Sequence, residues 1–460
     1  MTIKHDRLLP ELLAPGGDLL SVRAALDAGA DAVYLGLSRF NARRKAANIT
    51  DRDLPGLVLL AHERGARIFV TANILLTEEE IPDYIRFISF CLGAGVDGLI
   101  IADLGILTLV PALFPGAELH ASTQMTTHTS AQISFLRSFG VGRVNLAREL
   151  SVPDIAGLTA HAHGTGMETE VFIHGAYCIS FSGQCLMSSF IGGESGNRGI
   201  CFQPCRRRYA PVMSPPAHGS AGTGGQPANL LSLRDNNAIP IADDLVSVGV
   251  DSLKIEGRMK NFRYVHTVVA AWRRRLDRIA RGERDEDSYD ELSGVFNRDF
   301  SIGYALDRVG PGMFVDTPYD RSYREVGTVV SYRADTGTVT VTGEPVEPGT
   351  KIVICTEENQ LVCGGQVEEV LPGGRGSSSM RIRIESELRQ KILPGQTLLS
   401  AENRAETQGL EERLAGMEPR KIRLRARLSG KEGQPLILEL AAERSLGPPE
   451  SGVQGATTAA

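Results

Sequence analysis

The sequence predicts an α/β protein: a TIM-like (β/α)8 barrel followed by a small β-barrel domain and a truncated β-rich carboxyl-terminal segment. Two observations support this prediction. From residue 11 to about residue 280, short apolar runs alternate with amphipathic stretches of helical length, the rhythm of a parallel sheet. The rhythm has eight periods, the strand number of a closed barrel, and no Gly-x-Gly-x-x-Gly follows the first run. The competing topology is a doubly wound open sheet.

The predicted barrel occupies residues 8–284. Its strands are expected where apolar and β-branched residues cluster, at 11–14, 32–37, 67–72, 98–102, 118–121, 143–146, 170–174 and 252–256. Helices are expected between them, with clear helical periodicity at 19–28, 81–92 and 265–279. Two Ala-Gly-x-Asp sequences, at 28–31 and 94–97, are typical of a helix that ends on glycine and leads into the next strand.

The βα pattern is interrupted between the seventh and eighth strands, over residues 175–250. This insertion holds four of the seven cysteines and a Gly/Ser/Pro-rich stretch at 214–228, predicted to be a flexible surface loop. It follows the carboxyl end of a barrel strand, where barrel enzymes keep their active sites.

The composition changes after residue 285. Six short β-rich runs separated by turn residues predict a small β-barrel or sandwich over 285–400. Residues 401–445 are expected to form a partial β-rich unit, with its opening strands within 421–440. Residues 446–460 lack the apolar content to fold and are predicted to be a disordered tail.

Overall composition excludes several classes of protein. Hydrophobic residues make up 42% and charged residues 23%, and the net charge is −6, which excludes an acidic disordered chain and a histone-like basic protein. We find no signal peptide and no apolar stretch of the ~20 residues needed to cross a bilayer. A cytoplasmic location with reduced thiols is therefore expected.

Four cysteines are clustered: Cys178, Cys185, Cys201 and Cys205 lie within 28 positions, among glycines that allow a chain to wrap closely around a bound centre. Thiolates in this number suit zinc or an iron–sulfur cluster. The gaps of seven, sixteen and four contain no Cys-x-x-Cys pair, which weakens the zinc interpretation. The alternative is that they are small buried apolar residues, as we expect for the isolated cysteines Cys91, Cys355 and Cys363.

Polar residues follow several predicted strands at their carboxyl ends, which meet at the mouth of a barrel. Those expected to point into the mouth are Asn73, Gln124, Arg148, Glu149, His174, Lys254, Glu256 and Arg258. The cationic ones are suited to hold a carboxylate or an RNA phosphate. His174, next to the cysteine-bearing loop, is the best candidate for acid–base work or for supporting a metal ligand. For each of them a structural ion pair is the alternative.

Two basic clusters predict contact with nucleic acid. Residues 254–284 contain ten basic and three acidic residues, and Arg206, Arg207 and Arg208 form a second cluster beside the cysteines. The alternative is a solvated helix face. Because both clusters are expected near the mouth, we predict one positive surface that binds an RNA phosphate backbone.

The sequence resembles the peptidase U32, or collagenase-like, family over roughly residues 12–370. The family signature Glu-x-Phe-x-x-Gly-Ala-x-Cys-x4-Gly-x-Cys-x-x-Ser stands at 170–188. Further family-like segments are Tyr34-Leu-Gly, Phe40-Asn-Ala-Arg43, His120-Ala-Ser-Thr-Gln124-Met, Arg148-Glu-Leu-Ser, Asn197-Arg-Gly-Ile-Cys201, Lys254-Ile-Glu-Gly-Arg258-Met-Lys260 and Phe296-Asn-Arg-Asp-Phe-Ser-Ile-Gly303.

The resemblance implies hydroxylation of bases in ribosomal or transfer RNA, or of a ubiquinone precursor, with prephenate as a possible oxygen donor. The sequence motif around Cys201 is most similar to the family branch linked to 5-hydroxycytidine in ribosomal RNA. Several members carry a cysteine-ligated 4Fe–4S cluster, which implies the four clustered cysteines as its ligands. Cofactor-binding side chains are implied at Asn41, Arg43, Asn73 and Gln124.

One departure from the family concerns the fourth ligand. Members often place a cysteine shortly before the Lys-Ile-Glu-Gly-Arg motif, and the corresponding stretch here contains Asn237 instead. The fourth ligand is then Cys205, a side chain such as Asn237, or an open iron site.

Two other functions remain as alternatives. The older family name suggests a peptidase; the chain has no His-Glu-x-x-His or Gly-x-Ser-x-Gly, but Cys178 or Cys185 paired with His174 or His120 would form a cysteine protease. The other alternative is a non-catalytic RNA-binding member that has lost a cluster ligand.

Overall fold

The computed structural model describes residues 9–44, 46–210, 228–285, 287–315, 323–343, 346–356, 361–371, 377–387, 392–400, 404–419, 424–430 and 437–442. The predicted loop at 214–228 and the predicted tail at 446–460 lie almost wholly or wholly outside these residues.

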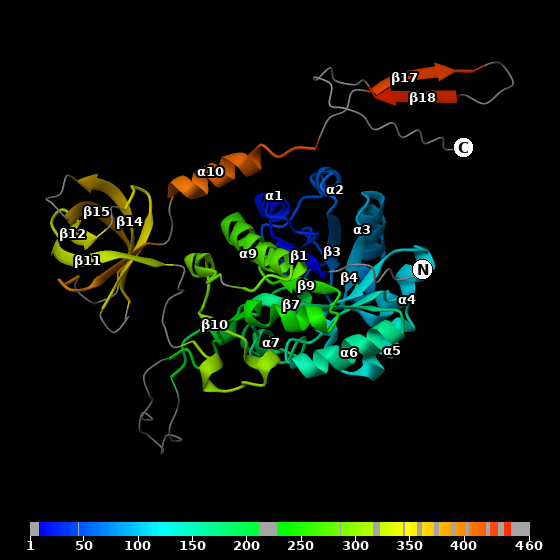
Figure 1. Cartoon of the computed structure of the whole chain (residues 1–460), viewed down its shortest axis with the longest axis horizontal. Coiled ribbons are helices and arrows are strands. Elements are labelled where there is room, and N and C mark those ends of the chain that lie inside the picture. Colours follow the sequence, from blue (N-terminus) through cyan, green and yellow to red (C-terminus); the bar gives the residue numbers. More distant parts are fainter. Residues whose placement is uncertain are drawn as a thin grey trace. The chain divides into compact units, whose positions relative to one another are not determined.

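Eight parallel strands close into a barrel, as predicted (Figure 1). They are β1 Glu11–Gly16, β2 Ala32–Leu35, β3 Arg67–Ala72, β4 Gly98–Ile101, β5 Leu119–Ala121, β6 Arg143–Asn145, β7 Glu168–Ala176 and β9 Ser252–Ile255. Consecutive strands pair in parallel from β1–β2 through β6–β7. Strand β9 pairs in parallel with both β7 and β1 and so closes the barrel. This closure excludes the open doubly wound sheet.

Helices surround the barrel and bury an apolar layer against it (Figure 1). They are α1 Leu19–Asp27, α2 Leu54–His62, α3 Ile81–Gly93, α4 Leu104–Leu113, α5 Ser130–Arg137, α6 Val152–Gly164, α8 Ala242–Ser247 and α9 Phe262–Ala280. Side-chain caps fix several starts: Asp18 accepts from the Ser21 amide, and Thr129 and Ser151 form capping boxes. After α1 and α3, Gly29 and Gly95 adopt positive φ, as the Ala-Gly-x-Asp pattern predicts.

The insertion contributes a short helix, α7 Met187–Gly192, and one short strand, β8 Asp235–Asn237, which is joined by a second short strand from beyond α9. Strand β8 pairs antiparallel with the end of β7, and β10 (Phe300–Ser301) pairs in parallel with β8. The end of β7 therefore has two strand partners, β9 within the barrel and β8 outside it.

A second, antiparallel barrel follows. It consists of β11 Arg324–Arg333, β12 Thr338–Gly343, β13 Lys351–Cys355, β14 Leu361–Leu371, β15 Ser377–Glu387 and β16 Thr397–Ser400, closed in the order β11-β12-β15-β14-β13-β16. Its core is small and aliphatic, with Val339, Val341 and Ile354 fully buried. Of the two predicted architectures, the barrel is the one observed.

Residues 404–415 form helix α10 (Arg404–Ala415), where the sequence predicts a β-rich segment. The helix packs against α1, and Arg23 of α1 donates to the carbonyls of Leu414 and Ala415 at its carboxyl end. Strands β17 (Leu424–Ser429) and β18 (Ile437–Ala442) form an antiparallel hairpin in a separate compact unit. None of the helices in the described part of the chain is both long and apolar enough to span a membrane.

Candidate active site at the mouth of the barrel

The segment that carries the clustered cysteines, residues 178–205, is held against the loops that follow the barrel strands. We call it the cysteine segment. The Ser182 amide donates to Glu149 Oε1 at 3.0 Å, and Arg148 Nε donates to Ser182 Oγ at 3.2 Å. Gly183 has φ +79°, and a Cβ there would lie 2.3 Å from the carbonyl oxygen of Gln124. The first half of the cysteine segment is thus fixed to the loops after β5 and β6.

The second half of the cysteine segment contacts the loops after β2 and β3. The Arg44 amide donates to the Gly199 carbonyl at 3.2 Å, and a Cβ on Gly199 would lie 2.3 Å from the Asn41 carbonyl oxygen. Arg198 forms a two-bond ion pair with Glu80, at 2.9 and 2.8 Å. Since these loops all lie at the carboxyl ends of the strands, the segment is positioned at the barrel mouth.

The Cys205 thiol lies within electrostatic reach of the other three clustered cysteines. Cys178, Cys185 and Cys205 are half-buried and Cys201 is exposed. Burial raises the pKa of the Cys205 thiol, Arg206 lowers it, and Cys178, Cys201 and Cys185 each raise it. The donor set therefore suits a thiolate-bound centre in its chemistry. Within the described residues, however, no group of three or more His, Cys, Asp or Glu side chains is arranged to hold a metal ion.

The three isolated cysteines have different surroundings. Cys91, Cys355 and Cys363 are buried, as predicted. Burial raises the pKa of Cys91 to about 12 and that of Cys363 to about 11, so these thiols stay protonated at neutral pH.

Lys254 lies below the mouth, inside the barrel. Its ammonium donates to Glu170 Oε1 at 2.7 Å and lies 4.4 Å from the centre of the Tyr34 ring. Asn145 Nδ2 donates to the same carboxylate oxygen at 2.6 Å. Burial alone would raise the pKa of Glu170, but the charges of Lys254 and Arg143 outweigh burial and lower the pKa below its usual value. The carboxylate therefore stays charged. Lys254 is thus paired and buried, and the structure does not present it to a ligand at the mouth.

The ionic network continues to the amino-terminal end of the barrel, because Arg143 Nη1 lies 3.6 Å from Glu170 Oε2. Arg143 bridges Glu11 and Glu168, each at 2.6 Å, and Arg67 pairs with the other oxygen of Glu11. His120, predicted as a possible protease partner, belongs to this end: its Nε2 lies 2.7 Å from Glu118. The first residues of the strands thus close the barrel opposite the mouth.

Arg258 is buried at the mouth and organises the loop after β2. It donates to Thr71 Oγ1 at 2.9 Å, to Asn41 Oδ1 at 3.1 Å and to Asn48 Oδ1 at 2.6 Å. Burial lowers its pKa to about 10. Asn73 plays a similar part, since it donates to Ser122 Oγ at 3.0 Å. These side chains support the loops rather than face an open site.

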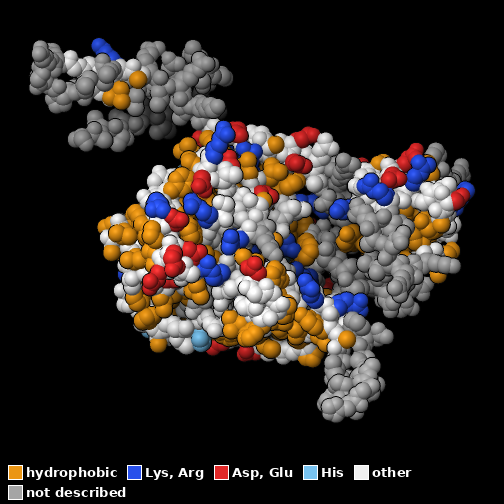
Figure 2. All heavy atoms as spheres, turned by 180° about the vertical axis from the view of Figure 1, so that it is seen from behind, with side chains coloured by type: hydrophobic (Ala, Val, Ile, Leu, Met, Phe, Trp, Pro, Cys, Tyr) orange, Lys and Arg blue, Asp and Glu red, His pale blue; other side chains and the backbone are white. Residues whose placement is uncertain are grey.

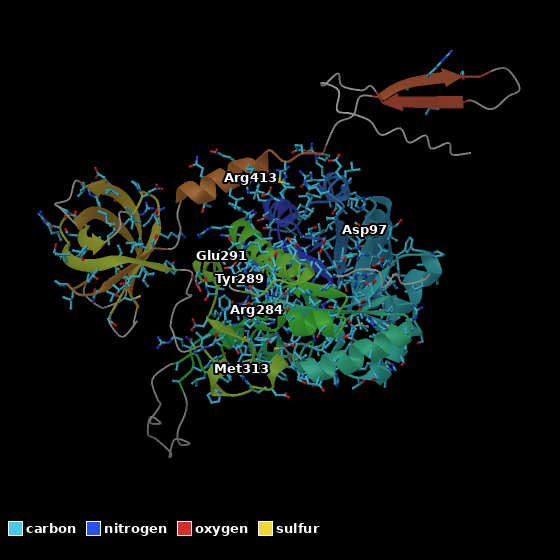
Figure 3. The ribbon with its side chains drawn as sticks, in the orientation of Figure 1. Asp97, Arg284, Tyr289, Glu291, Met313 and Arg413 are labelled. Carbon is cyan, nitrogen blue, oxygen red and sulfur yellow. The ribbon has the colours of Figure 1, made fainter. Side chains whose placement is uncertain are left out.

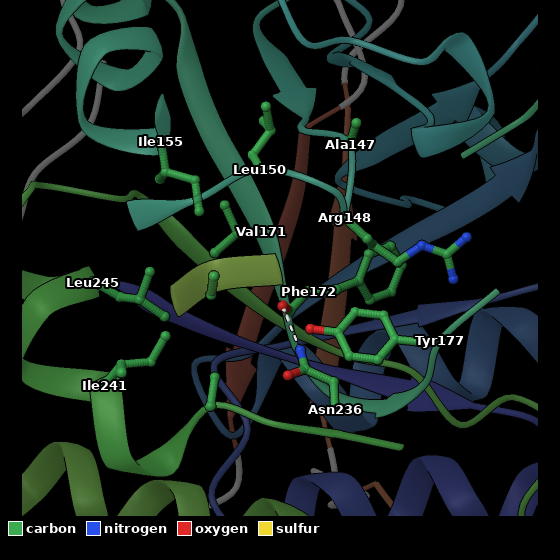
Figure 4. A pocket seen from close by; sticks show the side chains of 12 residues that line it. Ala147, Arg148, Leu150, Ile155, Val171, Phe172, Tyr177, Asn236, Ile241 and Leu245 are labelled. Carbon is green, nitrogen blue, oxygen red and sulfur yellow. Dashed lines mark hydrogen bonds between the residues drawn. The ribbon is translucent and has the colours of Figure 1, made fainter. Parts of the chain in front are cut away.

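Four charged side chains of the predicted set remain partly accessible at the mouth: Glu149, which accepts from Ser182, and Arg43, Glu256 and Arg148. Arg43 Nη2 lies 3.1 Å from Glu256 Oε1, and the two side chains are 38% and 18% exposed. Burial raises the pKa of Glu256, but Arg43 and Arg148 lower it below its usual range. Arg148 makes no ion pair within the described residues; it contacts Ser182, the Ala176 carbonyl and the Phe172 ring. Figure 4 shows its guanidinium extending away from the apolar residues behind it, beside Tyr177.

His174 does not join this set, which corrects the prediction. A β-bulge between Phe172 and His174 changes the alternation of β7, so that His174 pairs in register with Ile255. Its ring lies 5.5 Å from Phe300 and 6.2 Å from Tyr264. Burial lowers its pKa to about 3, against a hydrogen bond with Asn237 that raises it. His174 is therefore a neutral core residue at physiological pH.

The bulge is stabilised by a polar contact from β8. Asn236 Nδ2 donates to the Phe172 carbonyl at 3.0 Å, the bond drawn as a dashed line in Figure 4. Behind it lies a small cavity lined mainly by apolar side chains of the loop after β6 and of α6 and α8. Asn237, considered above as a cluster ligand, bonds to His174 instead.

The basic stretch 254–284 is largely neutralised, which corrects the predicted single positive surface. Arg273 pairs with Asp31, just before β2, so this part of α9 lies at the amino-terminal end of the barrel, away from the mouth. Arg274 pairs with Glu291, labelled in Figure 3 beside Tyr289. The remaining pairs of the α9 end are Arg275 with Asp243 and Asp285, Arg278 with Asp285 and Asp287, and Arg281 with Glu283. On the face shown in Figure 2, basic, acidic and hydrophobic side chains lie interspersed.

The second basic cluster divides in two. Arg206 is largely buried and donates to Ser232 Oγ and to the carbonyls of Leu233 and Tyr177. Arg207 and Arg208 are exposed. Of the three arginines in this cluster, Arg207 and Arg208 are the ones that present their side chains at the surface.

The sequence prediction missed two side chains that dock the cysteine segment to the barrel loops. Ser182 accepts from Arg148 and donates to Glu149, and Glu80 pairs with Arg198, yet neither residue type is distinctive in a sequence. The available signal was glycine: Gly183 and Gly199 both adopt positive φ where the segment meets a carbonyl.

Comparison with known proteins identifies a family and several relatives of this chain. The family model described as Peptidase family U32 matches residues 17–313. The 23S rRNA 5-hydroxycytidine C2501 synthase of Escherichia coli is 40% identical over 285 residues, which cover 61% of this chain and 41% of that protein. The tRNA hydroxylation protein P1 of Bacillus subtilis is 34% identical over 342 residues, which cover 72% of this chain and 80% of that protein. A collagenase of Porphyromonas gingivalis is 31% identical over 311 residues, covering 64% of this chain and 73% of that protein.

Proposed function

This chain belongs to peptidase family U32, and on that premise we propose that it hydroxylates a pyrimidine base of RNA, in a reaction of the 5-hydroxycytidine or 5-hydroxyuridine type. The main structural support is the docking of the cysteine segment at the barrel mouth, beside Arg43, Glu256 and Arg148. Relatives named for rRNA and tRNA hydroxylation support the same choice of substrate.

The proposed cofactor is an iron–sulfur cluster held by Cys178, Cys185, Cys201 and Cys205. Support comes from the presence of four thiols on one segment of 28 residues. Three of them, Cys178, Cys185 and Cys201, raise the pKa of the fourth, Cys205. When bound, such a cluster supplies electron transfer or structural support at the mouth. The protein's own part is to fix the segment through Glu149, Gln124 and the β2 loop.

The proposed co-substrate is a carboxylate-bearing oxygen donor such as prephenate. Hydroxylation replaces the hydrogen on carbon 5 of the base by a hydroxyl group, so the oxygen atom and a two-electron oxidation must come from a co-substrate. Among the cations predicted to hold its carboxylate, Lys254 and Arg258 are buried and engaged. Arg148, with Arg43 beside it, is the cation best suited to this role.

The peptidase alternative is not favoured by the arrangement of histidines. His174 is buried against Tyr264 and Phe300, and His120 pairs with Glu118 at the opposite end of the barrel. Within the residues that the structure describes, neither histidine contacts a thiol of the cysteine segment. A cysteine protease needs such a pair within hydrogen-bond reach.

The test combines deletion of the gene with mass spectrometry of total RNA. We expect loss of one hydroxylated pyrimidine, restored by the wild-type gene and not by Cys185→Ala, and iron and sulfide in protein purified without oxygen. If all RNA hydroxylations persist and the purified protein cleaves peptides in a Cys185-dependent way, the chain is a peptidase. If neither activity is found but RNA is bound, it is a non-catalytic member.

A further inference from the structure

Helix α7, in the middle of the cysteine segment, presents large apolar side chains to solvent. Phe190 is 86% exposed, Ile191 63% and Leu186 55%. Side chains of this size are normally buried, and a group of them on one short helix marks an interaction surface. We call these three residues the apolar tip.

The opposite side of α7 is anchored, so the apolar tip has a fixed position. Ser188 is buried and accepts from the Phe202 amide at 3.2 Å, and its hydroxyl lies 3.9 Å from the sulfur of Cys201. A Cβ on Gly192 would lie 2.4 Å from the Phe202 ring, so that ring packs directly against the helix end. The tip is therefore held at a defined place relative to Cys201.

Two exposed cationic side chains lie at the second half of the cysteine segment and just after it in sequence. Arg44 is exposed, and its side chain contacts the Gly199 position at the end of the cysteine segment. Arg207 is exposed two residues after Cys205. Glu194 is half-buried directly after the helix. A partner that combines apolar flat faces with negative charge fits such a surface, and single-stranded nucleic acid has both properties.

We propose that Phe190 stacks on a base of unpaired RNA, with Leu186 and Ile191 beside it, and so guides the neighbouring nucleotide into the barrel mouth. This inference rests on the proposed function and specifies its substrate: a single-stranded loop or end rather than a duplex. In a duplex the bases are already stacked, and a protruding phenylalanine has no free base face to meet.

The experiment measures binding of a short single-stranded RNA that carries 2-aminopurine, using the full chain purified without oxygen. We compare wild type with Phe190→Ala, Phe190→Trp and a control, Phe135→Ala. Phe135 is 51% exposed on α5, with its ring 4.9 Å from Phe139. Iron content and the unfolding temperature of each variant show whether it folds and keeps its segment.

We expect Phe190→Ala to weaken binding about 10- to 100-fold and to reduce quenching of 2-aminopurine, because base stacking on an aromatic ring is lost. Phe190→Trp and Phe135→Ala are expected to bind like wild type, and a duplex of the same sequence to bind weakly in all variants. Equal binding by Phe190→Ala and wild type overturns the inference, as does an equal loss for single-stranded RNA and duplex.

The assay separates this inference from the proposed function because it needs no turnover. If wild type hydroxylates RNA and Phe190→Ala binds normally, the inference alone fails. If wild type hydroxylates no base and Phe190→Ala still loses single-strand binding, the stacking role stands and the hydroxylase proposal fails.

Discussion

Substituting Gly183 by alanine tests whether the barrel loops hold the cysteine segment in place. Gly183 has φ +79°, and its Cβ would lie 2.3 Å from the carbonyl oxygen of Gln124. An ordinary carbon contact begins near 3.4 Å, so the segment must move by about 1 Å. The Gln124 atom at this contact is a backbone carbonyl oxygen, which can move less than the end of a flexible side chain.

Gly193 supplies a matched control for this variant. It has φ +70° in the same segment, but a Cβ there meets nothing within 4 Å. Both substitutions carry the cost of a left-handed alanine, about 1 kcal/mol. Only Gly183→Ala adds steric overlap, and overpacking costs about 1–3 kcal/mol, which corresponds to about 5- to 150-fold in the docking equilibrium.

Hydrogen–deuterium exchange of the apoprotein measures this difference. We expect amides of residues 178–205 to exchange faster in Gly183→Ala than in Gly193→Ala by that factor. The unfolding temperature should change little, because the segment lies outside the barrel core. Iron uptake during anaerobic reconstitution should fall in the same order. Equal exchange in the two variants would refute docking at the Gln124 carbonyl.

Two further predictions concern the barrel interior. Burial raises the pKa of Glu11, but Arg143 and Arg67 lower it to about 2 from 4.5, so its charge stabilises the fold above pH 4.5 and progressively less as the pH falls to 2. Glu11→Gln should therefore remove about 3 kcal/mol at pH 7 and flatten the acid limb of a thermal unfolding profile; an unchanged limb would contradict the ion pairs. Lys254→Met should destabilise by about 1–3 kcal/mol because Glu170 loses its nearest counter-charge while Arg143 remains at 3.6 Å, whereas the double variant with Glu170→Gln should recover stability and retain RNA hydroxylation. A double variant that is stable but inactive would instead assign Lys254 a chemical role.

The barrel was predictable because its strands are buried on both faces. Short apolar runs such as residues 68–70 of β3 and 98–101 of β4 identify such strands without knowledge of their partners. Helix α10 was not predictable in the same way. Its sequence is mostly polar, and its stability depends on α1, whose Arg23 bonds to its last carbonyls and whose Asp27 pairs with Arg413 at 2.7 Å.

The site was predicted less completely than the fold, for two physical reasons. Strand alternation places His174 on the same face as Phe172, and one bulged residue reverses that placement. Charge counted along a sequence also ignores partners distant in the chain: Arg273 and Arg275 belong to a basic run, yet their counter-charges Asp31 and Asp243 lie far from it in sequence. Patterns read within one element cannot reveal either effect.

The contacts that dock the cysteine segment explain how a long insertion can hold its thiols in place. Gly183 and Gly199 meet carbonyl oxygens of the Gln124 and Asn41 loops, and these loops follow directly from barrel strands. Backbone at a strand end is fixed by the sheet, so the segment inherits its position from the barrel rather than from its own sparse core. Cys201, and through Ser188 the tip at Phe190, are placed by the same contacts. Substitutions in the strand-end loops should therefore affect cluster binding and RNA binding together, although the loop residues need not touch either ligand.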